Sequence, residues 1–226
     1  MDKLAVLRQS FGFPAFRAGQ QTLIDAVLSG RDALGVMPTG GGKSLCYELP
    51  ALLLPGMTLV VSPLISLMKD QVMALRNAGI PAGCINSSMS LDELRETYRD
   101  ARYGAYKLLY VAPERLLTDG FCSLAQELEI PLVAVDEAHC ISQWGQDFRP
   151  SYLKIVEFLQ RLPRRPAVAA FTATATAQVR ADIIRILQLH EPETVVTGFD
   201  RPNLRFEVLR PKDKRTALLQ LLSERR

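Results

Sequence analysis

Short apolar runs rich in β-branched residues alternate along the chain with stretches of helical periodicity. The runs have the length of buried strands, and residues 66–79, 90–104 and 176–189 repeat apolar positions every three or four residues. This alternation predicts an α/β fold in which parallel strands are joined by crossover helices that cover both faces of the sheet. The expected strands are residues 32–38, 58–63, 81–86, 107–113, 132–139, 167–174 and 194–199.

Polar and glycine-rich motifs follow directly after several of these expected strands. In a parallel sheet, ligands bind beyond the carboxyl ends of the strands, which lie together at one edge. We therefore expect the chemistry of this protein to be concentrated at that edge. The motifs are residues 38–43, Ser62-Pro63, Pro113-Glu114, residues 136–139 and residues 172–174.

Composition narrows the class of protein. Apolar residues make up 48% and charged residues 23% of the 226 positions, as in globular proteins. No apolar run approaches the roughly 18 residues of a membrane span, and the first residues lack the apolar core of a secretory signal, so we expect a cytoplasmic protein without a membrane partner. The charge surplus, 27 basic against 24 acidic residues, is too small to indicate nucleic-acid binding by itself. The cysteines are solitary and predict neither disulfides nor a zinc site: Cys46, Cys84, Cys122 and Cys140.

The stretch PTGGGKS, residues 38–44, predicts a phosphate-binding loop. Its three glycines can adopt backbone angles closed to other residues, so that amide groups turn around phosphate oxygens at the start of the next helix. Lys43 would reach the β- and γ-phosphates, and the Ser44 hydroxyl would ligate Mg²⁺. The alternative is a glycine-rich turn with a surface lysine. The candidate phosphate-binding residues are Thr39, Gly40, Gly41, Gly42, Lys43 and Ser44.

The stretch LVAVDEAH, residues 132–139, ends an apolar strand with two acids. Burial of carboxylates is costly unless a cation or a ligand requires them. We expect Asp136 to hold Mg²⁺ through its water shell, and Glu137 to orient and deprotonate the attacking water at a γ-phosphate. Two acids at a strand end are also typical of a solvated turn, but their position downstream of a phosphate loop favours the catalytic interpretation.

In this order along the chain, the motifs resemble superfamily 2 helicases, and within them the first RecA-like lobe of the RecQ DNA helicases. The resemblance runs from about Leu7 to Asn203. It accounts for Met37, which stands where the general phosphate-loop pattern has glycine, as a normal superfamily 2 feature. It implies a three-layer αβα, RecA-like P-loop NTPase fold with a mainly parallel central sheet. The motifs that carry it are FGFPAFRAGQ (11–20), MPTGGGKS (37–44), VVSPLISLMKDQV (60–72), DEAH (136–139), HCISQWGQDFRPSY (139–152) and FTATAT (171–176).

The resemblance implies ATP and Mg²⁺ as cofactors. By it, Gln20 should read the adenine edge through the bidentate bond that a glutamine amide can make, while Arg17 and Phe13 pack near the base. Family members often have tyrosine at the position of Phe13, so stacking is retained here and a hydroxyl is lost. For Phe16, ordinary core packing is the better interpretation.

Residues 140–152 interleave large aromatic residues with glycine, proline and polar residues, which predicts a loop. Exposed Trp144, Phe148 and Tyr152 beside Arg149 would suit stacking on unpaired bases and a phosphate contact, whereas the alternative is a loop whose aromatic residues cover the core. The resemblance implies that this aromatic loop makes hydrolysis depend on DNA, and we assign that role to Trp144, Phe148 and Arg149. Gln146 stands where family members usually have histidine, which leaves the strength of coupling open.

Further contacts follow from the remaining motifs. The hydroxyls of Thr172 and Thr174 would bridge to His139 and couple DNA to hydrolysis, although service as strand and helix-cap residues is the alternative. We expect DNA-backbone contacts from Ser62, Pro63, Gln71 and Arg115.

We expect residues 1–204 to form the ATP-binding lobe and residues 205–226 to form a linker that begins a helix toward an absent second lobe. In RecQ-like motors an arginine finger comes from that second lobe, which lies outside this chain together with a zinc module and a winged-helix module. The parent protein would be an ATP-dependent DNA helicase of 3′-to-5′ polarity that acts on single-stranded and partly duplex DNA in repair or recombination. One lobe alone would be inactive as a helicase.

Two other interpretations remain open. The first is an RNA-dependent ATPase of the same superfamily, which a preference for ribose strands would reveal. The second is a non-catalytic, ATP-dependent nucleic-acid-binding module, which the absence of turnover would reveal.

Overall fold

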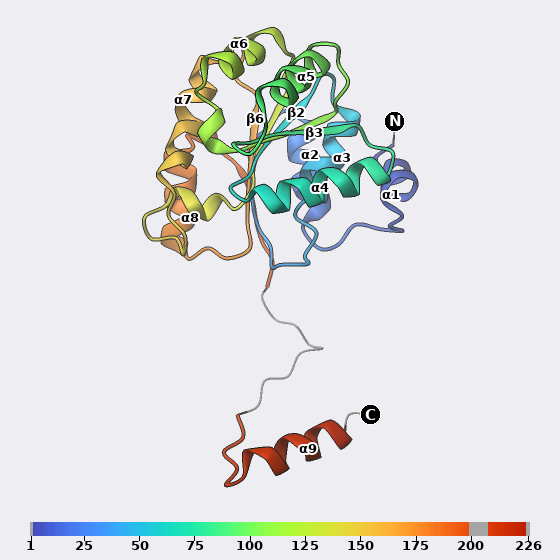
Figure 1. Ribbon diagram of the computed structural model, residues 1–226, viewed down its shortest axis with the longest axis vertical. Helices are drawn as coiled ribbons and strands as arrows, with labels where there is room; N and C mark the ends of the chain where they lie inside the picture. The colour runs from blue at the N-terminus through green and yellow to red at the C-terminus, as the bar shows by residue number, and fades with distance from the viewer. Residues whose placement is uncertain (1, 199–207, 225–226) are drawn as a thin grey trace.

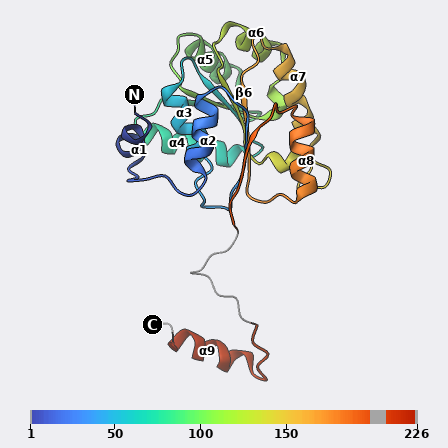
Figure 2. The same cartoon turned by 180° about the vertical axis from the view of Figure 1, so that it is seen from behind.

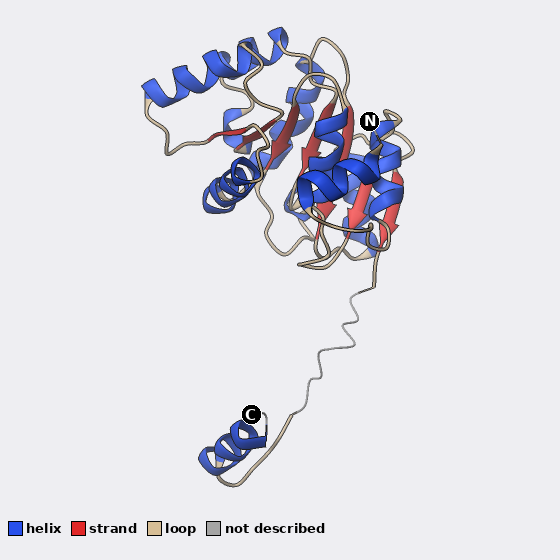
Figure 3. Ribbon diagram, turned by 90° about the vertical axis from the view of Figure 1, so that its right-hand side faces the viewer, coloured by secondary structure: helices blue, strands red, loops and turns tan. Residues whose placement is uncertain are grey.

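A parallel β-sheet forms the centre of the computed structural model, which describes residues 2–198 and 208–224. Within these residues the sheet has seven strands in the order β3-β4-β2-β5-β6-β1-β7, and every neighbouring pair is parallel. Figure 3 shows strands in red between helices in blue. The strands are β1 (Ala33–Val36), β2 (Thr58–Val61), β3 (Ala82–Ile85), β4 (Leu108–Val111), β5 (Leu132–Val135), β6 (Ala167–Thr172) and β7 (Glu193–Val196).

The strand register brings the carboxyl ends of the strands to one edge. Val61 at the end of β2 lies opposite Val111 of β4 and Val135 of β5, and Val36 of β1 lies opposite Thr172 of β6. The loops that follow these five strands therefore leave from the same edge. This confirms the predicted strands and their common edge.

Helices cover both faces of the sheet, which gives three layers (Figures 1 and 2). Apolar side chains of α1 to α4 pack on one face, and those of α5 to α8 pack on the other. The predicted α/β three-layer fold is confirmed. The helices are α1 (Lys3–Phe11), α2 (Gln20–Leu28), α3 (Leu45–Leu53), α4 (Ile65–Asn77), α5 (Leu91–Arg102), α6 (Asp119–Glu127), α7 (Lys154–Arg161), α8 (Ala177–Ile186) and α9 (Lys214–Glu224), with short 3₁₀ helices η1 (Pro113–Arg115), η2 (Ala138–Ile141) and η3 (Pro150–Leu153).

Each central strand contributes to both apolar layers. In β5, Leu132 and Ala134 face the layer of α1 to α4, whereas Val133 and Val135 face the layer of α5 to α8. All four side chains are fully buried. A strand buried on both faces has no polar side, which explains why the sequence shows continuous apolar runs rather than alternation.

The predicted helices at residues 66–79, 90–104 and 176–189 correspond to α4, α5 and α8. The helix expected near the end of the chain is α9, whereas the predicted boundary after residue 204 lies outside the described residues. No helix among the described residues is long and apolar enough to cross a membrane. The described residues hold no group of three or more His, Cys, Asp or Glu placed to bind a metal, and all four cysteines are free.

Candidate functional site

The phosphate loop connects β1 to α3 and depends on its glycines. Gly40 and Gly42 have φ of 79° and 81°, in the left-handed region that favours glycine. A Cβ on Gly42 would lie 2.3 Å from Nε2 of Gln20, and a Cβ on Gly41 would lie 2.8 Å from the carbonyl oxygen of Pro38. The loop can therefore take this path only with glycine at these positions.

Side chains of the motif at residues 11–20 donate hydrogen bonds to the phosphate loop. Gln20 is 2% exposed; its Nε2 donates to the carbonyl of Gly42 (3.0 Å), and its Oε1 accepts from the amide of Arg17 (2.8 Å). The Arg17 guanidinium donates to the carbonyl of Gly40. The expected contact of Gln20 with an adenine edge stays a prediction, and it requires the amide to exchange these partners.

The two acids follow β5 and differ in their environment. Burial, and next the charge of Glu137, raise the pKa of Asp136 to about 6. Glu137 has φ of 46°, a left-handed conformation that costs a non-glycine residue on the order of 1 kcal/mol and is frequent at functional sites. The Nζ of Lys43 donates to the carbonyl of Met37 (3.2 Å), and the charge of Lys43 opposes the rise in the pKa of Asp136. The pKa of Glu137 is lowered, first by the His139 hydrogen bond and further by the charge of Lys43.

One cavity of about 430 Å³ brings most of the predicted nucleotide-site residues together. It also includes Gln71, which was expected to contact DNA, and Phe13, which is 45% exposed. Gly41 does not line it, whereas Ala15, Leu45 and Leu67 add apolar walls that were not predicted as site residues. The lining residues are Phe13, Ala15, Arg17, Gln20, Thr39, Gly40, Gly42, Lys43, Ser44, Leu45, Leu67, Gln71, Asp136 and Glu137.

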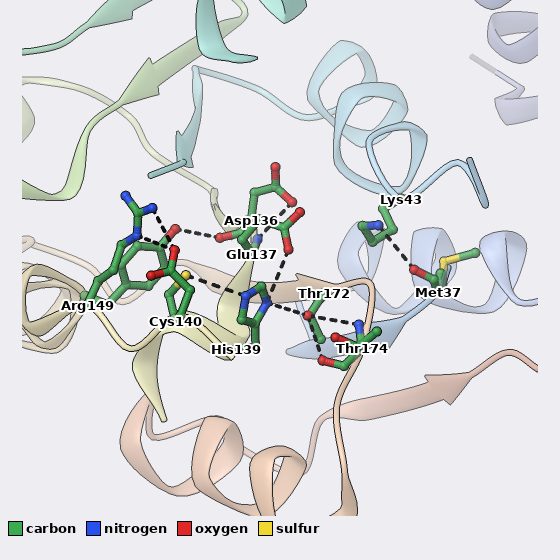
Figure 4. A network of polar contacts seen from close by, with 11 residues as sticks. Met37, Lys43, Asp136, Glu137, His139, Cys140, Arg149, Thr172 and Thr174 are labelled. Carbon is green, nitrogen blue, oxygen red and sulfur yellow. Dashed lines mark hydrogen bonds and ion pairs between the residues drawn. The ribbon is translucent and has the colours of Figure 1, made fainter. Parts of the chain in front are cut away.

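His139 connects the acids to β6 (Figure 4). Its Nδ1 lies 2.9 Å from Oγ1 of Thr172 and 3.2 Å from Oε2 of Glu137. The Cys140 thiol, and next the Glu137 carboxylate, raise the pKa of His139 to about 10, and the His139 hydrogen bond in turn lowers the pKa of Glu137.

The two threonines that were expected to bridge to His139 differ in their roles. The contact of Thr172 matches the bridge, and its hydroxyl also donates to the carbonyl of Thr174 (3.1 Å). Neither of them caps α8, because the N-cap is Thr176, whose side chain accepts from the amide of Val179 (3.3 Å).

The aromatic loop presents one strongly exposed ring. Trp144 is 75% exposed and Phe148 is partly buried. Tyr152, in contrast, is fully buried and its hydroxyl donates to the carbonyl of Asp136 (2.8 Å). The expectation that Tyr152 is an exposed base-stacking residue was wrong, because its ring fills the core beneath the acids while its hydroxyl satisfies a backbone carbonyl.

Arg149 joins the aromatic loop to the loop after β2. Its Nη1 donates to the carbonyl of Pro63 (3.1 Å), and its Nε and Nη2 donate to Oδ2 of Asp147 (2.9 and 2.7 Å). Two of the expected DNA-contacting groups nearby are buried: Ser62 is 1% exposed, and neither its hydroxyl nor Nε of Arg115 has a hydrogen-bond partner among the described residues. Of the predicted DNA-contacting residues, Gln71 lines the nucleotide cavity, whereas Ser62, Pro63 and Arg115 do not.

The sequence matches a family model over most of its length. The model of the DEAD/DEAH box helicase family covers residues 17–183, which contain the phosphate loop, both acids and the aromatic loop. The chain belongs to this family. Relatives at 48–50% identity are RecQ DNA helicases, which supports the resemblance to the RecQ family that the motifs indicated.

Curated relatives of this helicase lobe are much longer than the chain itself. It is 50% identical over 211 residues to an ATP-dependent DNA helicase RecQ of Bacillus subtilis, covering 93% of this chain and 36% of the relative. It is 48% identical over 206 residues to an ATP-dependent DNA helicase RecQ of Pasteurella multocida, covering 91% of this chain and 32% of the relative. The chain thus spans about a third of the length of these relatives.

Solved structures of other helicases share the fold of this DEAD/DEAH box lobe. A hypothetical ATP-dependent RNA helicase from Sulfolobus tokodaii superposes with a TM-score of 0.65 at 21% identity, covering 85% of this chain and 56% of that one. The DUF1998 helicase MrfA bound to DNA superposes with a TM-score of 0.67 at 16% identity, covering 87% of this chain and 29% of that one. At such identities the likeness establishes the fold.

Proposed function

We propose that this chain is the ATP-binding lobe of an ATP-dependent DNA helicase of the RecQ type, with 3′-to-5′ polarity and a role in DNA repair or recombination. The observation that carries the proposal is the single cavity in which the phosphate loop, the Gln20 motif and the acids Asp136 and Glu137 meet. Relatives at 50% and 48% identity that are named ATP-dependent DNA helicases support it.

The residues of the cavity fit ATP with Mg²⁺. Gly40 and Gly42 adopt left-handed backbone angles that favour glycine, and Lys43 supplies a cation for phosphate oxygens. Ser44 and Asp136 offer the oxygen ligands that Mg²⁺ prefers, and both line the cavity. Bound there, Mg²⁺ would neutralise charge on the phosphate oxygens.

Glu137 is the proposed general base. In this proposal its carboxylate takes a proton from water while the water oxygen bonds to the γ-phosphorus and ADP leaves. The His139 hydrogen bond lowers the pKa of Glu137, which keeps the carboxylate ionised at neutral pH and therefore able to accept a proton. His139 also contacts Thr172, so we assign His139 and Thr172 to the coupling path.

Single-stranded DNA is the proposed partner of the aromatic loop. The exposed ring of Trp144 offers a face for an unpaired base, and Phe148 extends the apolar surface. Arg149 would bind a phosphate by exchanging its bond to Pro63, which would transmit contact with DNA to the segment after His139. Partly duplex DNA would be engaged by the complete protein.

A second RecA-like lobe is the proposed source of the missing cation. Phosphoryl transfer gains about three to five powers of ten in rate from an arginine finger. We place the lobe boundary at residue 204, with residues 205–226 as the linker toward that second lobe. This lobe alone would bind ATP and unwind no DNA.

The deciding experiment is ATP hydrolysis by the chain without nucleic acid, with single-stranded DNA and with single-stranded RNA. Glu137→Gln removes the base, and Glu127→Gln makes the same substitution on the exposed surface of α6 as the matched control. The expected result is Mg²⁺-dependent ATP binding that Glu137→Gln retains, with turnover absent or greatly reduced until a second lobe is present.

Other outcomes separate the alternatives. A DNA-selective rate that Glu137→Gln lowers by about 10²-fold or more would mean that the lobe carries its own complete catalytic set. A rate selective for RNA would favour an RNA-dependent ATPase. Failure to bind ATP at all would refute the proposal.

A further inference from the structure

Ser142 lies at the base of the aromatic loop and has two polar partners. The residue is fully buried; its Oγ donates to Oδ2 of Asp182 at 2.8 Å and accepts from the backbone amide of Trp144 at 3.1 Å. The turn after it is tight, because a Cβ on Gly145 would lie 2.2 Å from the carbonyl oxygen of His139. The amide of Gly145 also donates to the carbonyl of Ser142 (2.9 Å), so the buried hydroxyl adds the side-chain contact that holds the backbone of Trp144.

The direction of this hydrogen-bond chain is set by Asp182. An ionised carboxylate can only accept hydrogen bonds, so the Ser142 proton must point to Asp182 and the hydroxyl lone pairs must face the amide of Trp144. Asp182 is 6% exposed, and its other oxygen, Oδ1, accepts from Arg185 at 2.8 Å. Chains of this kind strengthen each bond by polarisation.

The same segment is tied to β6 and α8 at both ends. His139 contacts Thr172 at the end of β6, and three residues later Ser142 contacts Asp182 on α8. Between the aromatic loop and α8 lies an open cleft of about 470 Å³ whose walls include Trp144, Phe148 and Ile186. A shift of the Trp144 backbone is thus transmitted to a short segment that begins at the proposed coupling histidine.

We propose that Ser142 and Asp182 are positioning residues that hold the Trp144 ring in the pose in which it receives an unpaired base, and that α8 is the element against which the aromatic loop is fixed. The part that concerns DNA rests on the proposed function. The part that concerns the pose of Trp144 stands on the hydrogen-bond chain alone.

The sequence offers a direct probe, because Trp144 is the single tryptophan of the chain. Time-resolved fluorescence anisotropy and acrylamide quenching of the 226-residue protein report the mobility and the exposure of its ring. We expect Ser142→Ala and Asp182→Ala each to increase ring mobility. The double variant should match either single variant, because the two residues act in one chain.

Two further variants serve as controls. Ser142→Thr keeps the hydroxyl and should restore the wild-type anisotropy. Arg185→Ala removes a partner of Asp182 that does not contact Ser142, and it should leave the anisotropy unchanged. Thermal unfolding establishes that each variant is folded. If Asp182→Ala does not fold, Ser142→Ala with its rescue by threonine carries the test.

Binding of a fluorescein-labelled oligothymidylate is the second readout. We expect Ser142→Ala to weaken it about tenfold, the loss that one displaced stacking contact produces, and Ser142→Thr to restore it. Unchanged anisotropy in Ser142→Ala, additive effects in the double variant, or increased mobility with undiminished DNA affinity would each overturn the proposal. If the wild-type chain binds no oligothymidylate, the proposed function fails, and the anisotropy alone decides the pose of Trp144.

Discussion

At the scale of single residues, His139 combines three contacts on one ring. Its Nδ1 faces both Thr172 and Glu137, and its Nε2 lies 3.9 Å from the Cys140 sulfur. The Cys140 thiol and the Glu137 carboxylate raise the pKa of His139 to about 10, so the ring is a cation at neutral pH. This places a positive charge next to the proposed base, where it keeps Glu137 ionised.

The raised pKa of His139 predicts how stability depends on pH. Because the pKa of His139 rises from 6.5 to about 10 on folding, the protonated ring stabilises the folded state. This contribution is fully present below pH 6.5 and is lost as the pH rises toward 10. We expect the difference in unfolding free energy between wild type and His139→Gln to be constant below pH 6.5 and to shrink above it. Urea unfolding at a series of pH values measures this difference. A difference that grows with pH would contradict it.

Trp144 supports a second prediction at this scale. Because its ring is 75% exposed and lies outside the nucleotide cavity, Trp144→Ala should weaken DNA stimulation of hydrolysis by the complete protein more than it weakens ATP affinity. Loss of one stacked base corresponds to about 1–3 kcal/mol. Tyr103→Ala is the control, because it removes a ring that is 83% exposed at the carboxyl end of α5. Equal losses of DNA stimulation and ATP affinity would refute the assignment.

At the scale of elements, the shape of the phosphate loop depends on its glycines. The loop turns through left-handed angles at Gly40 and Gly42 and packs against the side chain of Gln20 from α2. The loop and the Gln20 motif therefore act as one unit, although 22 positions separate Gln20 from Gly42.

This packing predicts unequal effects of alanine at two glycines with similar backbone angles. Gly30→Ala, at φ of 76° with no atom within 4 Å of the new Cβ, should cost about 1 kcal/mol of stability and leave ATP binding intact. Gly42→Ala, at φ of 81°, would also displace Nε2 of Gln20, so ATP affinity should fall by tenfold or more. Fluorescent-nucleotide titration measures the ATP affinity of each variant, and thermal unfolding measures its stability. Equal ATP affinities would show that Gln20 does not set the loop path.

At the scale of the whole molecule, buried Asp32 and partly exposed Arg165 form an ion pair that connects three strands at the edge opposite the site. Asp32, immediately before β1, accepts from both Nη atoms of Arg165 before β6. It also accepts from the amide of Val168 in β6 (2.9 Å) and from the amide of His190 before β7 (2.7 Å). Because β6, β1 and β7 are neighbours, these contacts join the amino-terminal ends of the three strands, at the edge opposite the nucleotide loops.

The contacts of Asp32 should make the free energy of unfolding depend on pH in the acid range. Although burial opposes it, the hydrogen bonds from Arg165, His190 and Val168 lower the pKa of Asp32 below 3.8, so its stabilisation is present above that pH and is lost as the pH falls through the lowered value. We expect Asp32→Asn to lower the unfolding free energy by about 1–3 kcal/mol at neutral pH, and we expect this difference from wild type to shrink in acid. Glu127→Gln, which breaks an exposed pair with Arg102, is the control for urea unfolding and should have no measurable effect.

Several helices could not be predicted from local periodicity, for identifiable reasons. In α3 every residue from Leu45 to Ala51 is buried, so the helix has no polar face to reveal its period, and Pro50 lies inside it. The segment that became α6 has Gly120 in its first turn, and glycine is a poor helix former. Predictions succeeded where one helix face meets water, as in α5 with its capping box at Ser90 and Glu93.

The sequence by itself determined the parallel sheet, its ligand-binding edge and the motifs that reach it, because apolar runs and glycine patterns are local properties of the chain. Only the tertiary structure decided that Tyr152 is buried under Asp136, that Gln71 lines the nucleotide cavity, and that Arg149 donates to Pro63 across 86 positions. These contacts depend on the strand order β3-β4-β2-β5-β6-β1-β7, which sets the loops that become neighbours. Local periodicity carries no information about that order, because every strand is a similar short apolar run.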